Sequence, residues 1–202
     1  MKKRFAARIF SHNTLPVQPA QGSLLVSEPF LEESYFRHVV ISLIDCGPNS
    51  GAMGVVLNNE LELRLDEVME GVERSVPLYC GGPMAQDRLF FIHNLGPDVI
   101  PDSRLYAPGL WVGGDFDMAL AYVNAGYPLK GHMRFFVGYS GWDDGQLNGE
   151  IENDVWAVGS SRLLDSTTLL SLADDALWHA AVRALGPYYR TWQLHPVRPA
   201  LN

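Results

Sequence analysis

Residues 133–151 read MRFFVGYSGWDDGQLNGEI, and this run predicts a strand followed at once by a helix. Met133–Tyr139 is the most strand-like segment of the chain, because aromatic and β-branched side chains favour a pleated backbone. The helix is predicted to begin at Asp143, whose carboxylate can accept a backbone N–H bond as the N-cap residue. Gln146 follows three residues later and can reach back to the Asp143 backbone. The stretch therefore predicts a strand-to-helix junction closed by a capping box.

Short strands and helices are predicted on both sides of this junction. The strands fall at Ser23–Val26, His38–Ile44, Met53–Leu57, Val76–Cys80, Leu89–His93, Leu110–Val112 and Trp156–Val158. The other helices are expected at Leu63–Met69, from Asp115 to Gly126, and from Asp174 or Asp175 to Leu185. Strands and helices alternate without a regular βαβ repeat, so the pattern favours an α+β fold over a doubly wound sheet.

Length and composition indicate one globular domain. The chain has 202 residues, of which 47% are hydrophobic and 19% charged, as is typical of a folded protein. No repeat or linker interrupts residues 22–186, so we expect them to form the α+β domain. Residues 1–21 are expected to be an extended basic lead-in. Residues 187–202, with aromatic side chains and with Pro196 and Pro199, are expected to be an extended tail packed on the body or on a second copy.

Basic residues are concentrated at the two ends of the chain. Lys2, Lys3, Arg4 and Arg8 fall in the first 13 residues, which contain no Asp or Glu. Residues 14–186 contain nine Lys and Arg against 23 Asp and Glu, a formal charge of −14 with His neutral. Such a body repels phosphate backbones, so specific nucleic-acid binding is not expected. The basic end is either a short solvated segment or a small nucleic-acid arm.

The sequence contains no signal for a membrane span, a metal site or a cofactor. No apolar run approaches the ~20 residues that cross a bilayer, and Arg8 interrupts the apolar stretch Phe5–Phe10, which argues against a signal peptide. Cys46 and Cys80 lack zinc-type spacing, and the six His residues form no zinc motif. No glycine-rich nucleotide-binding loop is present. We therefore expect a cytoplasmic protein with no metal and no bound cofactor.

Three places could carry chemistry, and each also has a structural interpretation. Ser140 lies between a strand and a helix, as the nucleophile of a hydrolase does, although Trp142 replaces the second Gly of that motif. Otherwise its hydroxyl is hydrogen-bonded within a turn. His93 ends an apolar strand and is either a general base or a hydrogen-bonded structural residue. Gly81 and Gly82 either offer backbone N–H groups to an anion or reverse the chain.

Several motifs resemble the YqgE/AlgH family of bacterial proteins, over about residues 22–186. The most specific block runs from Gly138-Tyr139-Ser140-Gly141-Trp142 through Gln146-Leu147 to Glu150-Ile151. The other matching segments are Gly22–Leu25, Gly54–Asn58, Gly81–Pro83, Trp156 and the helix that contains Trp178 and ends at Gly186. The chain departs from the family at Asp143-Asp144, where Gly-Pro is usual. The resemblance implies one domain whose strongly bent mixed sheet closes into a pseudo-barrel flanked by short helices, and it implies no established reaction, cofactor or catalytic residue.

These observations favour a non-catalytic binding or regulatory module for an unspecified protein or small-molecule ligand. The ligand groove is expected beside the 138–150 block, and its candidate residues are Asn58, Gly81, Gly82, His93, Tyr139, Ser140 and Trp142. The residues expected to hold the block together are Asp143, Gln146, Leu147 and Trp156. The alternative is a hydrolase-like enzyme that uses His93 and Ser140. A third hypothesis, a transcriptional regulator, follows a label given to some family members and lacks a helix-turn-helix signal here.

Overall fold

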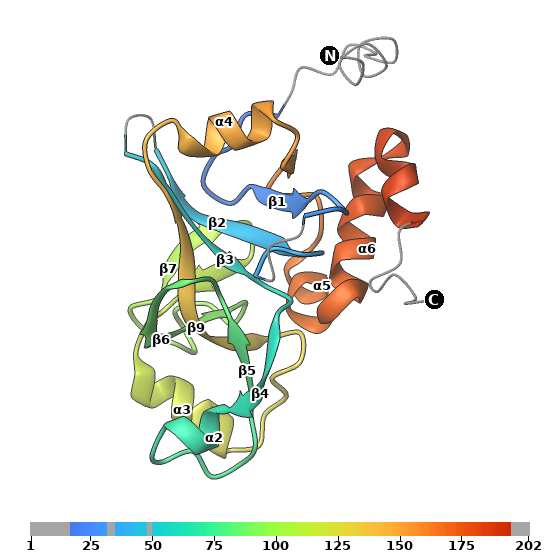
Figure 1. Cartoon of the computed structure of the whole chain (residues 1–202). Coiled ribbons are helices and arrows are strands. Elements are labelled where there is room, and N and C mark those ends of the chain that lie inside the picture. Colours follow the sequence, from blue (N-terminus) through green and yellow to red (C-terminus); the bar gives the residue numbers. More distant parts are fainter. Residues whose placement is uncertain (1–16, 32–34, 48–49, 195–202) are drawn as a thin grey trace, which may run out of the picture.

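The segment that opens the sequence analysis forms β9 (Met133–Trp142), the strand that joins the two halves of a single sheet (Figure 1). The structure is a computed structural model, and it describes residues 17–31, 35–47 and 50–194. The first part of β9 pairs with β6 (Met84–His93) and, in parallel, with β5 (Pro77–Cys80). Its last three residues pair with β3 (Ala52–Val56). One long strand therefore belongs to both halves of the sheet.

The sheet has ten strands in the described part of the chain, in the order β10-β1-β2-β3-β9-β6-β8-β7, with β5 on β9 and β4 on β5. The remaining strands are β1 (Leu24–Ser27), β2 (Val40–Cys46), β4 (Glu60–Arg64), β7 (Arg104–Ala107), β8 (Leu110–Val112) and β10 (Trp156–Gly159). Every pair except β5–β9 is antiparallel. The sheet curls strongly into a half-barrel, which confirms the predicted bent mixed sheet and α+β class (Figure 1).

Glycine permits the sharp bend of β9. Gly138 has φ +71°, a left-handed conformation that other residues rarely adopt. The chain after β5 crosses β9 at this point so closely that a Cβ on Gly81 would lie 2.2 Å from the Gly138 carbonyl oxygen. A Cβ on Gly82 would lie 2.4 Å from the Tyr139 carbonyl carbon. The three glycines therefore let two backbone segments touch where the sheet turns.

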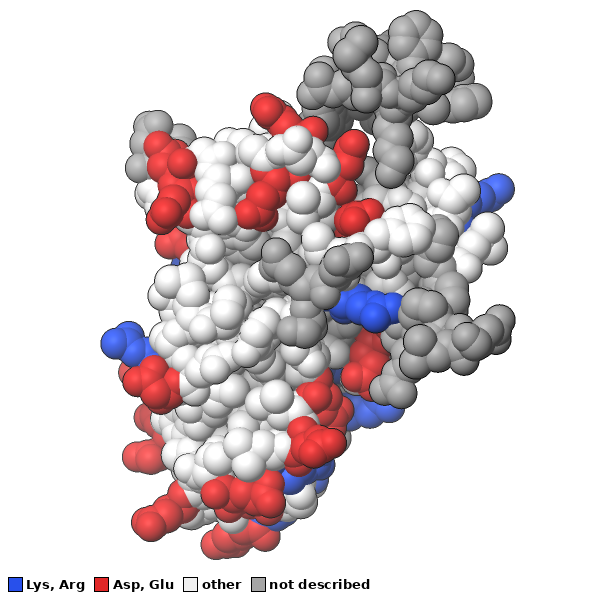
Figure 2. Space-filling model, viewed as in Figure 1, with Lys and Arg blue, Asp and Glu red and all other residues white. Residues whose placement is uncertain are grey.

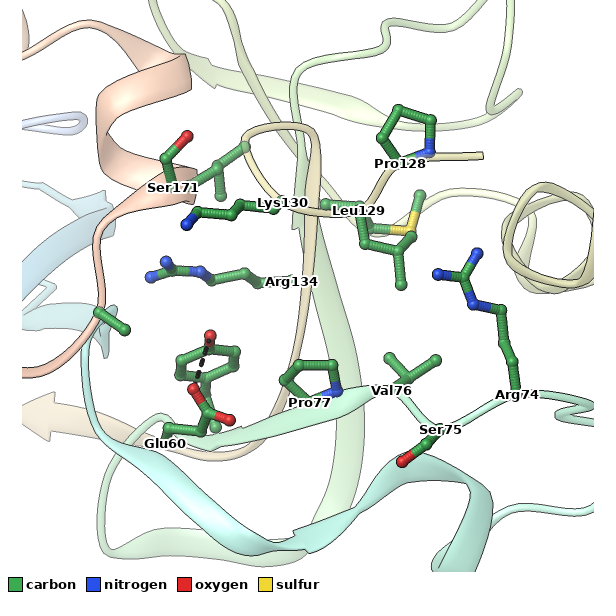
Figure 3. Close-up of a pocket in the computed structure, with 14 residues that line it drawn as sticks. Glu60, Arg74, Ser75, Val76, Pro77, Pro128, Leu129, Lys130, Arg134 and Ser171 are labelled. Carbon is green, nitrogen blue, oxygen red and sulfur yellow. Dashed lines mark hydrogen bonds between the residues drawn. The ribbon is translucent and has the colours of Figure 1, made fainter. Parts of the chain in front are cut away.

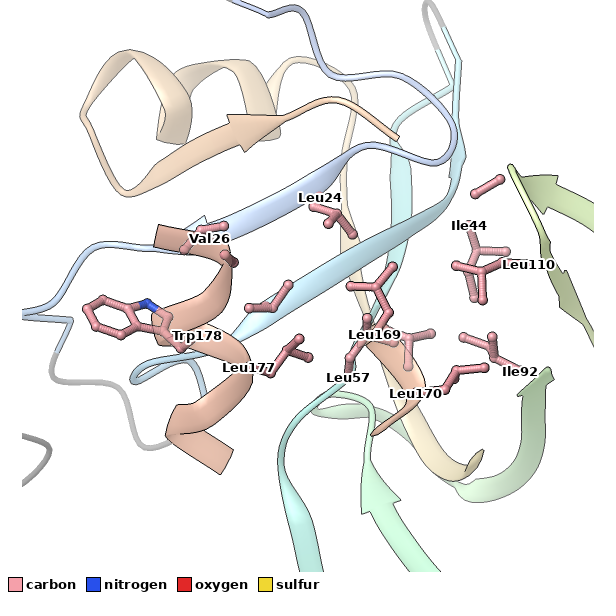
Figure 4. Close-up of a cluster of buried hydrophobic side chains, with 14 of the residues drawn as sticks. Leu24, Val26, Ile44, Leu57, Ile92, Leu110, Leu169, Leu170, Leu177 and Trp178 are labelled. Carbon is pink, nitrogen blue, oxygen red and sulfur yellow. The ribbon is translucent and has the colours of Figure 1, made fainter. Parts of the chain in front are cut away.

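Short helices cover the curled sheet and enclose three hydrophobic clusters. The helices are α2 (Leu65–Val68), α3 (Phe116–Asn124), α4 (Gln146–Glu152), α5 (Ser166–Ser171) and α6 (Asp174–Leu185). The first cluster packs α5 and α6 on β1, β2 and β3 through Leu24, Val26, Ile44, Leu57, Leu169, Leu170, Leu177 and Trp178 (Figure 4). The second lies beneath α2 and α3, and the third beneath α4. None of the helices in the described residues is long and apolar enough to cross a membrane.

Several local predictions need correction. β4, β7 and α5 were not predicted, because these short segments show neither clear alternation nor a helical repeat. Helix α4 begins at Gln146 with Gly145 as its N-cap, so Asp143 is not the capping residue. Helix α6 likewise begins after Ala173, without a side-chain cap from either predicted Asp.

The tail is not extended over its described part. Residues Pro187–Leu194 form a 3₁₀ helix, η1, in which Tyr189 and Trp192 pack against the first cluster. Pro187 suits the first position of a helix, where its missing N–H needs no partner. Pro196 and Pro199, the basis for expecting an extended tail, lie outside the described residues. A proline restricts its own position and the one before it, so neither residue prevents a helix that ends at Leu194.

Candidate functional site

The Glu150 carboxylate holds the strand-to-helix junction together. One of its oxygens accepts hydrogen bonds from the indole N–H groups of Trp142, at 2.8 Å, and Trp156, at 2.7 Å. The other accepts a bond from the side-chain amide of Gln146, at 3.0 Å. The Gln146 amide oxygen in turn accepts from the backbone N–H of Asp143, at 3.0 Å. The predicted reach of Gln146 back to the chain is thus present, although the helix begins later than expected.

The same residues form the third hydrophobic cluster. Trp142 is 7% exposed and meets Trp156 edge to face, with ring centroids 6.2 Å apart. Leu147 is buried in the same cluster as the two Trp rings, whereas Asp143 is exposed. The hydrogen bonds and ring contacts of the junction therefore converge on Glu150, which was not among the predicted junction residues.

We expect Gln146→Ala to lower the free energy of unfolding by about 1 kcal/mol, the usual cost of losing a cap. Gln146 bonds the backbone of Asp143 and also the Glu150 carboxylate, and both bonds disappear in the variant. Urea unfolding measures the change. Asn148→Ala is the matched control, because Asn148 is exposed on the same helix and its side chain makes no hydrogen bond to a described residue. Equal losses in the two variants would contradict the assigned role.

The structure does not bring His93 and Ser140 together. His93 pairs with Met133 at the start of β9, whereas Ser140 lies seven residues later, beyond the bend at Gly138, where it pairs with Gly54 of β3. His93 is fully buried; its Nε2–H donates to the Gly113 carbonyl and its Nδ1 accepts from the Leu95 N–H. Burial lowers its pKa. A nucleophile and its base must lie within hydrogen-bond reach, so this pair lacks the geometry of a hydrolase.

Three other candidate groove residues have structural contacts. Asn58 is 4% exposed, and its side chain bonds the backbone of Val40, His38 and Asp174. The Gly81 N–H donates to Val137, so it is not free to bind an anion. The Ser140 hydroxyl, also buried, donates to the Gly81 carbonyl at 3.3 Å.

A different pocket gathers basic residues from distant parts of the chain (Figure 3). It has a volume of about 450 Å³ and lies between β4, β5, the loop before β9, and α5. We call it the basic pocket and define it by Glu60, Arg74, Ser75, Val76, Pro77, Tyr79, Pro128, Leu129, Lys130, Met133, Arg134, Leu170, Ser171 and Ala173. Lys130 and Arg134 extend side by side, and their cationic ends lie on the Ser171 side of the pocket (Figure 3). Three positive side chains thus line one hollow of an acidic protein.

Arg134 is buried in this pocket, with 4% of its surface exposed. Its guanidinium donates to the carbonyls of Leu57, at 2.7 Å, and Leu172, at 2.8 Å, and lies 4.5 Å from the Tyr79 ring centroid. A guanidinium has five N–H donors, so these two bonds leave three. Among the described residues, no carboxylate forms an ion pair with it. Burial lowers the pKa of Arg134, an effect opposed by the nearby Tyr79, Glu60 and Asp174.

Glu60, the acidic residue of the pocket lining, already has partners. One oxygen accepts from Arg64 at 3.1 Å, and the other accepts from the Tyr79 hydroxyl at 3.3 Å. Burial raises the pKa of Tyr79, so its hydroxyl keeps its proton at neutral pH. Lys130 is exposed and makes no ion pair within the described part of the chain. The positive charge of Lys130 therefore remains available in the pocket.

A turn at Gly131 positions Lys130. The Gly131 N–H donates to Leu170 at 2.9 Å, and its carbonyl accepts from the Asn94 amide at 2.8 Å. Gly131 has φ +84°, and a Cβ there would lie 2.8 Å from the Ser171 hydroxyl oxygen. The lysine is therefore held beside α5 by a backbone turn that requires glycine.

Known proteins match this chain over most of its length. A family model described as AlgH-like matches residues 24–190. The chain belongs to the AlgH-like family. A UPF0301 protein of Parabacteroides distasonis is 40% identical over 194 residues, covering 95% of both chains. One from Chlorobium phaeobacteroides is 36% identical over 183 residues, covering 90% of this chain and 95% of the other.

Solved structures agree with the AlgH-like assignment. The solution structure of the AlgH protein from Pseudomonas aeruginosa has a TM-score of 0.63 and 28% identity, and the match covers 86% of this chain and 94% of that one. The crystal structure of a Corynebacterium diphtheriae protein has a TM-score of 0.70 and covers 95% and 98% of the two chains, and its 24% identity supports the shared fold alone. The family resemblance inferred from sequence is thus confirmed.

Sequence reasoning missed the basic pocket of this AlgH-like chain. The available signal was Arg134, a charged residue inside the most strand-like segment of a chain poor in bases. An arginine flanked by Met133 and Phe135 must either reach the surface or be buried with partners. The other pocket residues lie from Glu60 to Ala173, and only the fold brings them together.

Proposed function

We propose that this AlgH-like protein is a non-catalytic binding module that holds a small anionic molecule in the basic pocket. The observation that carries the proposal is the buried Arg134 guanidinium, which lies beside Lys130 and has no carboxylate within ion-pair distance among the described residues; Glu60 and Asp174 act on it only from farther away. Buried charges in proteins are normally paired, because desolvation of an unpaired ion is costly. An anionic group in the pocket would supply that missing partner.

The distribution of charge supports the same proposal. Residues 14–186 contain nine Lys and Arg, and Arg74, Lys130 and Arg134 line this one pocket. On the face drawn in Figure 2, acidic side chains outnumber basic ones. Electrostatic attraction is stronger in a partly buried pocket than at an exposed surface, because solvent screens it less there. The pocket therefore concentrates positive potential in a protein whose net charge is negative.

The apolar residues that line the basic pocket indicate a second feature of the ligand. Val76, Pro77, Leu129, Met133 and Leu170 contribute apolar surface. A ligand that fits both parts combines a phosphate or carboxylate group with an apolar portion. A polar clamp within a largely apolar hollow is the usual construction of a small-molecule site.

The pocket residues favour binding over catalysis. The lining contains no His or Cys, and the Tyr79 hydroxyl donates to Glu60. The Ser75 hydroxyl accepts from Arg64, and within the described residues neither Ser75 nor Ser171 is hydrogen-bonded to Glu60 or Lys130, the lining groups that could act as a base. Cys46 and Cys80 are both free thiols, which fits a reducing compartment such as the cytoplasm. We therefore propose a cytoplasmic binding module, and a regulatory role would follow from occupancy of the pocket.

Isothermal titration calorimetry with inorganic pyrophosphate, a phosphate monoester and a short-chain carboxylate tests the proposal. We expect at least one of them to bind, and Lys130→Gln to weaken that binding about tenfold or more, since a charge-assisted hydrogen bond contributes about 1.5–3 kcal/mol. Arg104→Gln is the matched control, because Arg104 is exposed on β7 and does not line the pocket. No binding by the unaltered protein, or equal weakening by both variants, would contradict the proposal.

A further inference from the structure

A second hollow lies beside the strand-to-helix junction. It has a volume of about 450 Å³, and the lining residues that carry the argument are Asp45, Met53, Met84, Tyr139, Trp142 and Asp143. We call it the acidic groove. Two of the seven candidate groove residues, Tyr139 and Trp142, line this hollow, and the other five do not.

The acidic groove has an apolar, adaptable floor. Met84 is 45% exposed, and Met53 and Tyr139 are partly exposed. The Met84 sulfur lies over Gly141, where a Cβ would come within 2.7 Å of it. Methionine side chains are flexible, make favourable contacts with aromatic rings, and are common on surfaces that bind peptides. The floor therefore suits an apolar or aromatic side chain.

The rim of the groove is negative. Asp45 and Asp143 are exposed, and neither forms an ion pair with a described residue. No Lys, Arg or His belongs to the described lining. Acidic side chains also gather over α4 and the neighbouring end of the β2–β3 hairpin (Figure 2). A segment with positive charges and at least one aromatic residue would complement this groove.

The chain enters the described fold next to this groove. Residues 18–20 line an adjoining hollow of about 480 Å³, which shares Gly51, Ala52 and Asp143 with the acidic groove. The preceding residues carry Lys2, Lys3, Arg4 and Arg8 without any Asp or Glu, and they include Phe5, Ile9 and Phe10. Eight Cα-to-Cα steps lead from position 10 to position 18, and they can span up to about 26 Å at 3.3 Å each. The segment has the required charge, aromatic content and reach.

We propose that residues 2–10 bind in the acidic groove of their own chain, with Phe5 over Met53 and Met84 and with Arg4 and Arg8 at the acidic rim. The groove has room for a few side chains and not for the whole segment. The −14 charge of residues 14–186 strengthens the attraction of a segment that carries four positive charges. This inference is independent of the anion proposed for the basic pocket, because the two hollows share no lining residue.

Paramagnetic relaxation in the full-length chain tests the docking. A nitroxide label is attached at Ala6→Cys in a Cys46→Ser background, which removes the accessible natural thiol and leaves the buried Cys80 unlabelled. We expect the label to broaden the amide signals of Met53, Gly141 and Gln146 selectively. The Asp45→Asn, Asp143→Asn double variant should lose this broadening. The Asp98→Asn, Asp117→Asn double variant should keep it, because both residues are exposed elsewhere.

Three results would overturn the inference. Absent or uniform broadening would show that the segment does not occupy the groove. Equal loss of broadening in both double variants would show that the segment is attracted by the net charge of the protein and not by the groove. A mixed sample contains ¹⁵N-labelled chain without nitroxide and ¹⁴N chain with nitroxide. Broadening of the ¹⁵N signals in that sample would show that a second copy supplies the segment. The amide spectrum of each variant reports whether it is folded, so a folding failure is distinguishable from loss of docking.

Discussion

Trp142→Ala is expected to lower the free energy of unfolding by about 3–5 kcal/mol, the usual cost of truncating a buried aromatic side chain. The ring is 7% exposed, packs edge to face on Trp156, and donates to Glu150 at 2.8 Å. Its removal leaves a cavity in the third cluster and takes one of three donors from the Glu150 carboxylate. Because β9 joins both halves of the sheet, we expect the loss in one cooperative transition.

Urea unfolding followed by circular dichroism measures this effect. Trp142→Phe separates packing from hydrogen bonding, because it keeps most of the apolar surface and removes the indole N–H; it should cost less than Trp142→Ala. Tyr127→Ala is the exposed aromatic control, since Tyr127 is 56% exposed. An unchanged midpoint for Trp142→Ala would mean that the ring is available for binding and would move the ligand surface to Trp142 itself.

Asn58→Ala is expected to destabilise the fold by at least about 3 kcal/mol. The side chain accepts from the Val40 N–H at 2.8 Å and donates to the carbonyls of His38, at 2.9 Å, and Asp174, at 2.7 Å. Each buried group left without a partner costs about 1–3 kcal/mol. The three bonds tie the β2–β3 hairpin to the start of α6, so their loss should loosen the helix that carries Trp178.

The same urea unfolding assay measures the change in the free energy of unfolding. Amide hydrogen exchange shows which elements are loosened. We expect faster exchange in α6 and at Val40 than in α3, which does not contact Asn58. Asn148→Ala serves again as an exposed control. A stable Asn58→Ala variant that instead loses ligand binding would contradict the structural assignment and restore Asn58 to a ligand groove.

The sequence predicted the parts of the fold that local patterns determine. The run 133–139 identified the strand that organises the sheet, and the helix predicted from Asp115 is α3, where the Asp115 carboxylate accepts from the Met118 N–H as the N-cap. The predicted strands His38–Ile44 and Met53–Leu57 correspond to β2 and β3, which pair antiparallel as sequence neighbours. These features depend on neighbours within a few residues, so propensity and turn chemistry suffice to find them.

Features that depend on distant partners were missed or misplaced. Glu150 was not expected to bind two indole rings, because its partners come from β9 and β10 and meet only after the sheet curls. His93 was expected at a cleft, but both ring nitrogens bond backbone groups in the interior. A strand end predicts exposure only when nothing covers it, and here the segment around Gly113 covers it.

The basic pocket illustrates the same limit at the level of function. Its positive residues come from the loop before β5 and from the region around the start of β9, about sixty residues apart in sequence. The count of charged residues along the sequence indicated only that residues 14–186 are acidic overall. The fold brings these scattered bases to the lining of one pocket, which no window along the sequence could indicate.

The most direct test of the anion-binding proposal is the side-chain ¹⁵Nε–¹Hε resonance of Arg134 during titration with pyrophosphate, a phosphate monoester and a short-chain carboxylate. The proposal predicts that, with the anion that binds, this resonance shifts saturably, and that the shift at a given anion concentration falls in Lys130→Gln and not in Arg104→Gln. A resonance that stays fixed while every anion is raised to saturating concentration, or that moves identically in both variants, would contradict it.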